Sequence, residues 1–175
     1  MNTIKENNTL NYSEYAYQLG NFFYSKKNSG EEKKPYVIFT RDTYTATRVA
    51  EELEWFYKKL NVVIIPDWET LPYDSISPHP DLISDRLKTL FLVSQKIFDI
   101  LIIPATSALN LLPPKKYLLQ NSFIYNKGHT VDIESLKNLL VENGYFNVNK
   151  VFHPGEFAVR GGLIDLFPMG SQIPY

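Results

Sequence analysis

Apolar and polar positions follow two different periods along the first two thirds of the chain. Three stretches carry apolar side chains at helical spacing, namely residues 13–24, 42–60 and 81–97. Three short apolar runs have the length of buried strands, namely residues 36–40, 62–65 and 100–103. The expected N-caps are Ser13, Asp42 and Asp81, because a short polar side chain accepts a hydrogen bond from the first amides of a helix. Strands that alternate with amphipathic helices predict a parallel sheet, and therefore an α/β fold.

The pattern changes at Pro113 and Pro114, which cannot continue a helix and favour extended neighbours. We place a domain boundary there, between an α/β domain at residues 1–113 and a smaller α+β domain at residues 114–175. In the second domain we predict a strand, a helix and three more extended segments, at residues 122–126, 132–143, 145–152, 156–160 and 163–167. Asp132 is the expected cap of that helix, and short turns between the extended segments suggest antiparallel pairing.

Charge and composition narrow the range of functions. The 175 residues carry 18 Lys and Arg against 19 Asp and Glu, a formal net charge of -1, whereas proteins that coat nucleic acids or membrane surfaces usually have a positive excess. Cysteine is absent, which removes disulfides, thiol nucleophiles and zinc-thiolate sites. No apolar run approaches the ~20 residues that cross a bilayer, and the polar start is unlike a signal peptide. We therefore expect a soluble cytoplasmic protein without a membrane partner.

Alternating strands and helices would suit a nucleotide site, but the sequence lacks the motif for one. A P-loop needs GxxxxGK[ST], in which glycines let backbone amides approach the phosphates and the lysine neutralises them. Gly20 and Gly30 stand alone, and neither precedes a Lys-Ser or Lys-Thr pair. Because positioning and charge neutralisation supply most of phosphoryl-transfer catalysis, we predict no cofactor and no ATP hydrolysis by this chain.

The proline-rich segment PDWETLPYDSISPHPDLISDR is a second candidate for chemistry. It holds six side chains that could bind a divalent metal, namely Asp67, Glu69, Asp74, His79, Asp81 and Asp85. No ligand spacing such as HExxH or DxDxDG supports this interpretation. The structural alternative is that Asp81 caps a helix and the prolines hold Trp68 and Tyr73 as a rigid lid. His129 and His153 have no Ser-Asp arrangement around them, so we predict neither a catalytic residue nor a metal site.

A further signal lies in PGEFAVRGGLIDLFPMG, near the C-terminus. Strand alternation places Phe157 and Val159 on one face and Arg160 on the other. Two glycines follow Arg160, so another chain could approach the guanidinium closely and offer it a carboxylate. The same residues fit a β-hairpin in which the glycines form the turn and Arg160 is a solvated edge charge. Physical reasoning alone favours this second interpretation.

Three segments in order resemble the amino-terminal region of the bacterial transcription-repair coupling factors, the Mfd family. They are DWETLPYDSISPHPDLISDRL, ILIIPATSALNLLPP and PGEFAVRGGLIDLFPMGSQIPY. In that family this region resembles the excinuclease B subunit, UvrB, without its ATPase site, which agrees with the missing P-loop. The resemblance implies a degenerate helicase-like α/β domain followed by a small α+β domain that recruits the excinuclease A subunit, UvrA.

The resemblance also implies a partner-binding residue, because the family uses the arginine of the EFAVRGG segment, which is Arg160 here. The strand that presents it is implied to be held by Glu156, Phe157 and Gly161. UvrB has a basic residue where this sequence has Ala158, so that contact is not carried over. The family's binding face continues past the Pro-Tyr pair at the end of this sequence, so we expect the second domain to be truncated.

The whole family protein is an ATP-dependent DNA translocase that couples a stalled RNA polymerase to repair. The resemblance implies that its motor and its contacts with RNA polymerase and DNA lie in segments absent from these 175 residues. Our leading hypothesis is a non-catalytic recruitment module that binds UvrA in transcription-coupled nucleotide excision repair. Two alternatives stay open: a residual nucleotide- or metal-dependent hydrolase, and a helicase-derived DNA-binding module.

Overall fold

The computed structural model describes five parts of the chain, at residues 11–28, 34–70, 75–122, 125 and 128–175. The chain divides into two compact units. The first unit comprises Met1–Asp67 and Lys96–Asn110, and the second comprises Trp68–Gln95 and Leu111–Tyr175. The domain boundary at residue 113 stays a prediction, because compactness alone does not establish which segments fold independently.

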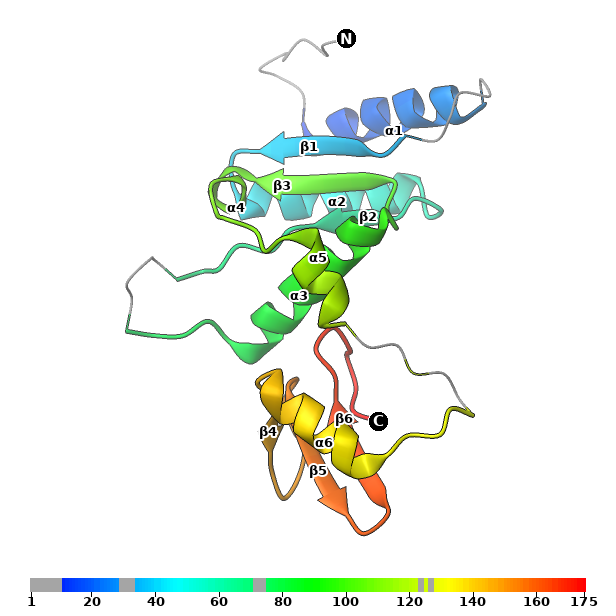
Figure 1. The fold of residues 1–175 in the computed structure, drawn as a ribbon. Helices are drawn as coiled ribbons and strands as arrows, with labels where there is room; N and C mark the ends of the chain where they lie inside the picture. The colour runs from blue at the N-terminus through cyan, green and yellow to red at the C-terminus, as the bar shows by residue number, and fades with distance from the viewer. Residues whose placement is uncertain (1–10, 29–33, 71–74, 123–124, 126–127) are drawn as a thin grey trace. The chain divides into compact units, whose positions relative to one another are not determined.

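The first unit is built around a parallel three-stranded sheet in the order β1-β3-β2 (Figure 1). Its strands are β1 (Tyr36–Thr40), β2 (Val62–Ile64) and β3 (Ile100–Pro104). In register, Ile102 of β3 lies between Ile38 of β1 and Ile64 of β2. The parallel pairing confirms the predicted α/β fold, and each strand lies within one residue of its expected bounds.

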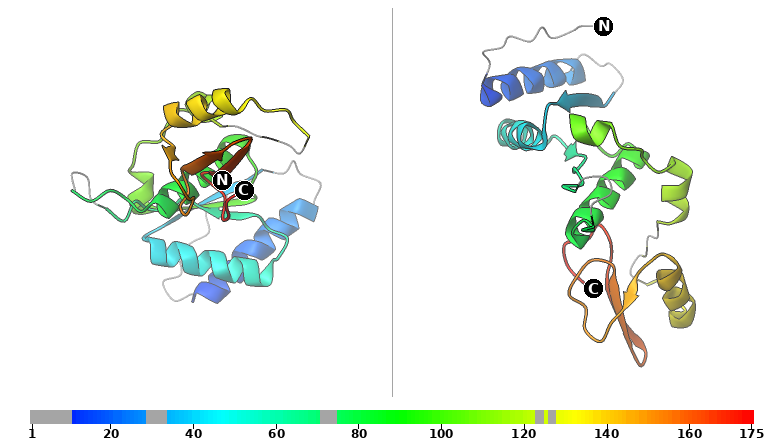
Figure 2. Two further views of the ribbon diagram at one scale, coloured as in Figure 1. Left: turned by 90° about the horizontal axis from the view of Figure 1, so that it is seen from below. Right: turned by 90° about the vertical axis from the view of Figure 1, so that its left-hand side faces the viewer.

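Two helices, α1 (Tyr12–Asn28) and α2 (Thr43–Phe56), pack against each other and against one face of this sheet (Figures 1 and 2). The buried core between them is apolar and contains Ala16, Phe23, Ile38, Ala46, Val49, Ala50, Leu53, Leu60, Ile100 and Ile102. Three of these residues are alanines, and side chains this small allow the two helices to approach closely. The first unit therefore has a continuous helix-on-sheet core of the kind the apolar pattern predicts.

The cap of α2 is as predicted, whereas the cap of α1 is not. The Asp42 carboxylate accepts a hydrogen bond from the Thr45 amide at 2.7 Å, and this bond, with the Arg41 guanidinium nearby, lowers the pKa of Asp42 to about 2. At α1 the Asn11 side chain accepts from the Glu14 amide at 2.8 Å, so Asn11 occupies the place expected for Ser13. The helix begins at Tyr12, so a cap at the preceding residue reaches the third helical amide.

The contact between α1 and Tyr57, the residue that follows α2, depends on Gly20 of α1. A Cβ atom at Gly20 would lie 1.8 Å from the nearest ring atom of Tyr57, so only glycine allows the ring to sit there. The Tyr57 ring stacks on Tyr24 at 5.1 Å between centroids, and its hydroxyl donates to the Tyr17 carbonyl at 3.0 Å. Gly20 therefore allows the Tyr57 ring to pack directly against α1.

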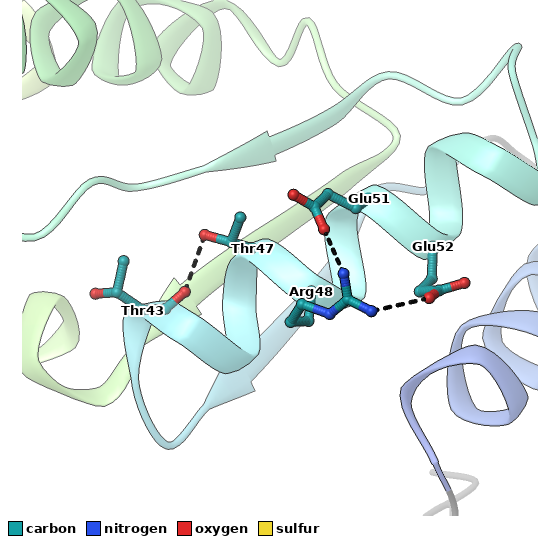
Figure 3. A network of polar contacts seen from close by, with 5 residues as sticks. All are labelled: Thr43, Thr47, Arg48, Glu51 and Glu52. Carbon is teal, nitrogen blue, oxygen red and sulfur yellow. Dashed lines mark hydrogen bonds and ion pairs between the residues drawn. The ribbon is translucent and has the colours of Figure 1, made fainter.

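The outward surface of α2 carries a row of polar contacts (Figure 3). The Arg48 guanidinium contacts the carboxylates of Glu51 at 2.9 Å and Glu52 at 3.5 Å. The Thr47 hydroxyl donates to the Thr43 carbonyl at 3.0 Å. These are the one-turn pairs common on solvated helix faces, and they do not converge on a ligand site.

The remaining helices of the described residues are α3 (Pro80–Gln95), α4 (Ala105–Ala108), α5 (Lys115–Gln120) and α6 (Ile133–Glu142). The short helices α4 and α5 have no counterpart among the sequence predictions. The predicted strand at residues 122–126 lies largely outside the described residues. No helix of the described residues is both long and apolar enough to span a membrane.

Helix α3 begins and packs differently from its prediction. It starts at Pro80, and the His79 ring accepts from the Asp81 amide at 3.3 Å, so Asp81 lies in the first turn instead of capping it. The buried positions of α3 are mostly polar, namely Ser84, Arg86, Thr89, Leu90 and Ser94. Arg86 lies over the Trp68 ring at 4.6 Å, and the Ser84 hydroxyl accepts from the Gly170 amide at 2.7 Å. Helical spacing of leucines alone could not identify this face, because hydrogen bonds and ring contacts offset the burial of polar groups.

Candidate interaction face

The second unit contains the sheet that carries the predicted site, in the order β4-β5-β6. Its strands are β4 (Phe146–Asn147), β5 (Glu156–Arg160) and β6 (Leu163–Phe167). Strands β5 and β6 match their predicted bounds and pair antiparallel. Strand β4 is only two residues long, against a predicted extended segment of 145–152, and it pairs parallel to β5. The sheet is mixed because the loop after β4 carries the chain back before β5 begins.

One face of β5 and β6 is covered by α6. Phe157 is fully buried and forms a cluster with Leu136 and Leu140 of the helix. Asp132 caps α6 as predicted, because its carboxylate accepts from the Ser135 amide at 3.1 Å, and the side-chain and backbone contacts with Ser135 lower the pKa of Asp132. Phe157 therefore lies in the core of this unit, where it supports the strand and does not reach solvent.

The opposite face presents Arg160 to solvent, as strand alternation predicts. Its side chain is 61% exposed, and its Nη2 lies 3.0 Å from Oδ2 of Asp165, which is 48% exposed. Asp165 is the register partner of Ala158, so the ion pair runs diagonally across the two strands. The hairpin of the second interpretation is present, with Arg160 as a solvated edge charge. The interpretation of Arg160 as a partner contact stays a prediction.

The turn between the two strands leaves open space around Arg160. Arg160 and Leu163 are register partners, so Gly161 and Gly162 form the whole connection. Gly161 has a φ of 58°, a left-handed conformation that favours glycine, and a Cβ atom at either glycine would have no neighbour within 4 Å. The glycines therefore serve both the backbone geometry of the turn and the access to the guanidinium.

Glu156 fixes the loop that precedes β5. One oxygen of its carboxylate, Oε2, accepts from the amides of Phe152 at 2.8 Å and His153 at 2.9 Å. These two backbone hydrogen bonds favour the ionised form and lower the pKa of Glu156. Glu156 thus positions the start of the strand that ends at Arg160, and His153 contributes its backbone amide to this arrangement.

The C-terminal residues return along β6. Tyr175 and Leu166 exchange both backbone hydrogen bonds, at 2.8 and 2.7 Å, which is the pattern of an antiparallel pair. The Tyr145 hydroxyl accepts from the Met169 amide at 2.9 Å, and burial raises the pKa of Tyr145. These contacts tie the segment after β6 to the body of the unit.

The metal-binding alternative has no support among the described residues. No group of three or more His, Asp or Glu side chains in them could hold a metal ion. His79 lies 3.4 Å from Asp81, a contact that belongs to the start of α3. Asp74, a member of the hypothetical ligand set, lies outside the described residues.

The structure adds two residues to the site that sequence reasoning did not single out. Asp165 pairs with Arg160, and Leu163 lies directly opposite Arg160 in the hairpin. Both positions follow from a two-residue turn at the glycines, because that turn fixes the register of β5 against β6. The signal was therefore in the sequence, in the spacing from the turn to Asp165.

Comparison with known proteins agrees with the resemblance found in the sequence. Residues 124–175 match the UvrB interaction domain family, and this segment includes Arg160 and all three strands of its sheet. Over 141 residues, 81% of this chain, the sequence is 39% identical to the transcription-repair-coupling factor of Escherichia coli. It is 40% identical over 139 residues to the protein of that name from Haemophilus influenzae, and 28% over 146 residues to the one from Bacillus subtilis. The chain spans about 12% of the length of these relatives.

Proposed function

Because this chain belongs to the transcription-repair-coupling factor family and carries the UvrB interaction domain, we propose that it is a recruitment module that binds UvrA. Its role would be to bring nucleotide excision repair to a stalled RNA polymerase in the bacterial cytoplasm. The ATP-driven translocation of the whole protein, and its contacts with RNA polymerase and DNA, belong in this proposal to the rest of the molecule.

The observation that carries the proposal is the exposure of Arg160 at the turn end of the β5–β6 hairpin. The Arg160 side chain is 61% exposed, on the face of the hairpin opposite the α6 core, and beside a turn without side chains. A guanidinium offers five N–H donors in a planar fork that suits a carboxylate. In this proposal Arg160 contacts UvrA directly, whereas Glu156, Phe157 and Gly161 hold the strand and turn that present it.

The Arg160–Asp165 pair determines how the contact should be tested. An Arg160→Glu substitution reverses the charge but places two carboxylates together, which also weakens the hairpin. The double variant Arg160→Asp with Asp165→Arg keeps an ion pair of opposite orientation, so it separates partner recognition from hairpin stability. Arg48→Glu on α2 is a matched control, because Arg48 is also an exposed arginine in surface ion pairs.

We would measure binding of the chain to purified UvrA by calorimetry, with thermal melting of each variant alongside. We expect Arg160→Glu and the exchanged pair each to lower the affinity at least tenfold, which is about 1.4 kcal/mol. Arg48→Glu should bind as the unsubstituted chain does. If the exchanged pair melts normally and binds UvrA at full affinity, Arg160 is not the contact; if the unsubstituted chain does not bind UvrA, the proposed partner is wrong.

A further inference from the structure

The open face around Arg160 also carries a large apolar side chain. Leu163 is 72% exposed although it lies within β6. Its register partner is Arg160, and directly opposed residues of an antiparallel pair project on the same face with Cβ atoms roughly 5 Å apart. A guanidinium and an isobutyl group therefore stand next to each other at the end of the hairpin.

Several features make this pair accessible to a flat or concave partner surface. The two turn glycines have nothing within 4 Å of the position of a Cβ atom, so no side chain shields Leu163 from that side. The α6 core lies on the opposite face, where Phe157 is buried. Isolated exposed leucines are common on protein surfaces, but this one directly opposes the residue that the proposed function singles out.

We propose that Leu163 is a second contact residue for UvrA, so that the surface recognised by this hairpin is a carboxylate beside an apolar hollow. This inference rests on the proposed function. Burial of the leucine would exclude water from the neighbouring charge contact, and charge pairs are stronger where water is excluded. Asp165 contacts the guanidinium at Nη2, and the guanidinium has further N–H donors to offer the partner carboxylate.

The test compares substitutions at Leu163 with one at another exposed apolar residue of the same unit. Leu163→Asn and Leu163→Thr remove the apolar group, and threonine keeps a strong preference for strands in case asparagine disturbs the hairpin. Leu163→Met retains apolar area. Val141→Asn is the matched control, because Val141 on α6 is also more than half exposed.

We expect Leu163→Asn and Leu163→Thr to lower the affinity for UvrA about tenfold and to make the heat-capacity change of binding less negative. Leu163→Met should stay within about twofold of the unsubstituted chain, and Val141→Asn should be indistinguishable from it. Full affinity of a folded Leu163→Thr chain, with loss of binding on exchange of Arg160 and Asp165, would overturn this inference and leave the proposed function standing. Absence of binding by the unsubstituted chain would overturn both.

Discussion

The two units cover their sheets with helices in different ways. In the first unit two helices cover one face of a parallel sheet, and the core between them joins residues from α1, α2, β1 and β3. In the second unit the helix α6 covers one face of β5 and β6, and the buried cluster beneath it contains Leu136, Leu140 and Phe157. On the opposite face of β5 and β6, Ala158 and Phe167 are also buried, whereas Arg160 and Leu163 beside the turn are exposed. The exposed groups of this hairpin therefore gather at its turn end.

This difference bears on where binding groups can be placed. Exposed charges of the first unit, such as Arg48, pair with neighbours one turn away along a helix. In the second unit Arg160 and Asp165 lie on strands beside a turn of two glycines. A short β-hairpin fixed by a few buried residues therefore presents charges in a defined geometry, and fold alone would not have located them.

The largest expected effect is on the core between α6 and the sheet of the second unit. Phe157→Ala should lower the free energy of unfolding of this unit by about 3–5 kcal/mol, because it removes the central buried ring of its cluster. Hydrogen exchange should show loss of protection in β5, β6 and α6. The control is Leu163→Ala, at an exposed position on the opposite face. It should leave the protection of the same amides nearly unchanged. Equal losses of protection in the Phe157→Ala and Leu163→Ala chains would contradict the assignment of Phe157 to the core.

In the first unit, the corresponding test targets the close approach at Gly20. Gly20→Ala should destabilise the protein by about 1–3 kcal/mol in denaturant unfolding, because its Cβ overlaps the Tyr57 ring, and this strain exceeds the gain in helix propensity. In a Tyr57→Leu background the same substitution should be neutral or stabilising. If Gly20→Ala instead stabilises the chain that retains Tyr57, the Tyr57 ring moves away from the new Cβ atom at little cost.

A smaller effect should follow from the carboxylate of Glu156. Its lowered pKa means that the ionised group stabilises the folded unit fully above its unfolded-state pKa of 4.5, and that this contribution is lost as the pH falls through the lower folded value. Because Glu156 is only half-buried and both of its hydrogen bonds lie at the surface, Glu156→Gln should cost no more than about 1 kcal/mol at neutral pH. Urea midpoints measured between about pH 3 and 7 should fall less steeply with decreasing pH in the variant than in the unsubstituted chain. An equally steep fall in both chains would exclude this role of Glu156.

The smallest effect is expected at the surface network of α2. Arg48→Ala should change the free energy of unfolding by no more than about 0.5 kcal/mol, and added salt should reduce the difference, because both contacts are one-turn pairs of an arginine at the helix surface. A salt titration of the melting temperature measures this. A larger loss that salt does not reduce would mean that Arg48 stabilises the first unit through more than these two charge contacts.

Sequence periodicity predicted most of the regular elements and the presenting residue of the candidate face. The bounds of β5 and β6 follow from alternation and from the glycine turn, and the face of Arg160 follows from the same alternation. The capping of α2 and α6 by Asp42 and Asp132 follows from short-range hydrogen bonding. What was missed is the diagonal partner Asp165 and the exposed Leu163, although the two-residue turn sets the strand register that places both beside Arg160.

The sequence by itself determined features that depend on neighbouring residues: strand alternation, the caps of α2 and α6, the turn, and the absence of a P-loop. Only the tertiary structure decided the parallel pairing of β4 with β5, the burial of polar residues on α3 and the pairing of Tyr175 with Leu166. The physical reason is distance along the chain. Local signals act through hydrogen bonds and torsion angles within a few residues, whereas these three features are fixed by contacts that form only when distant segments meet.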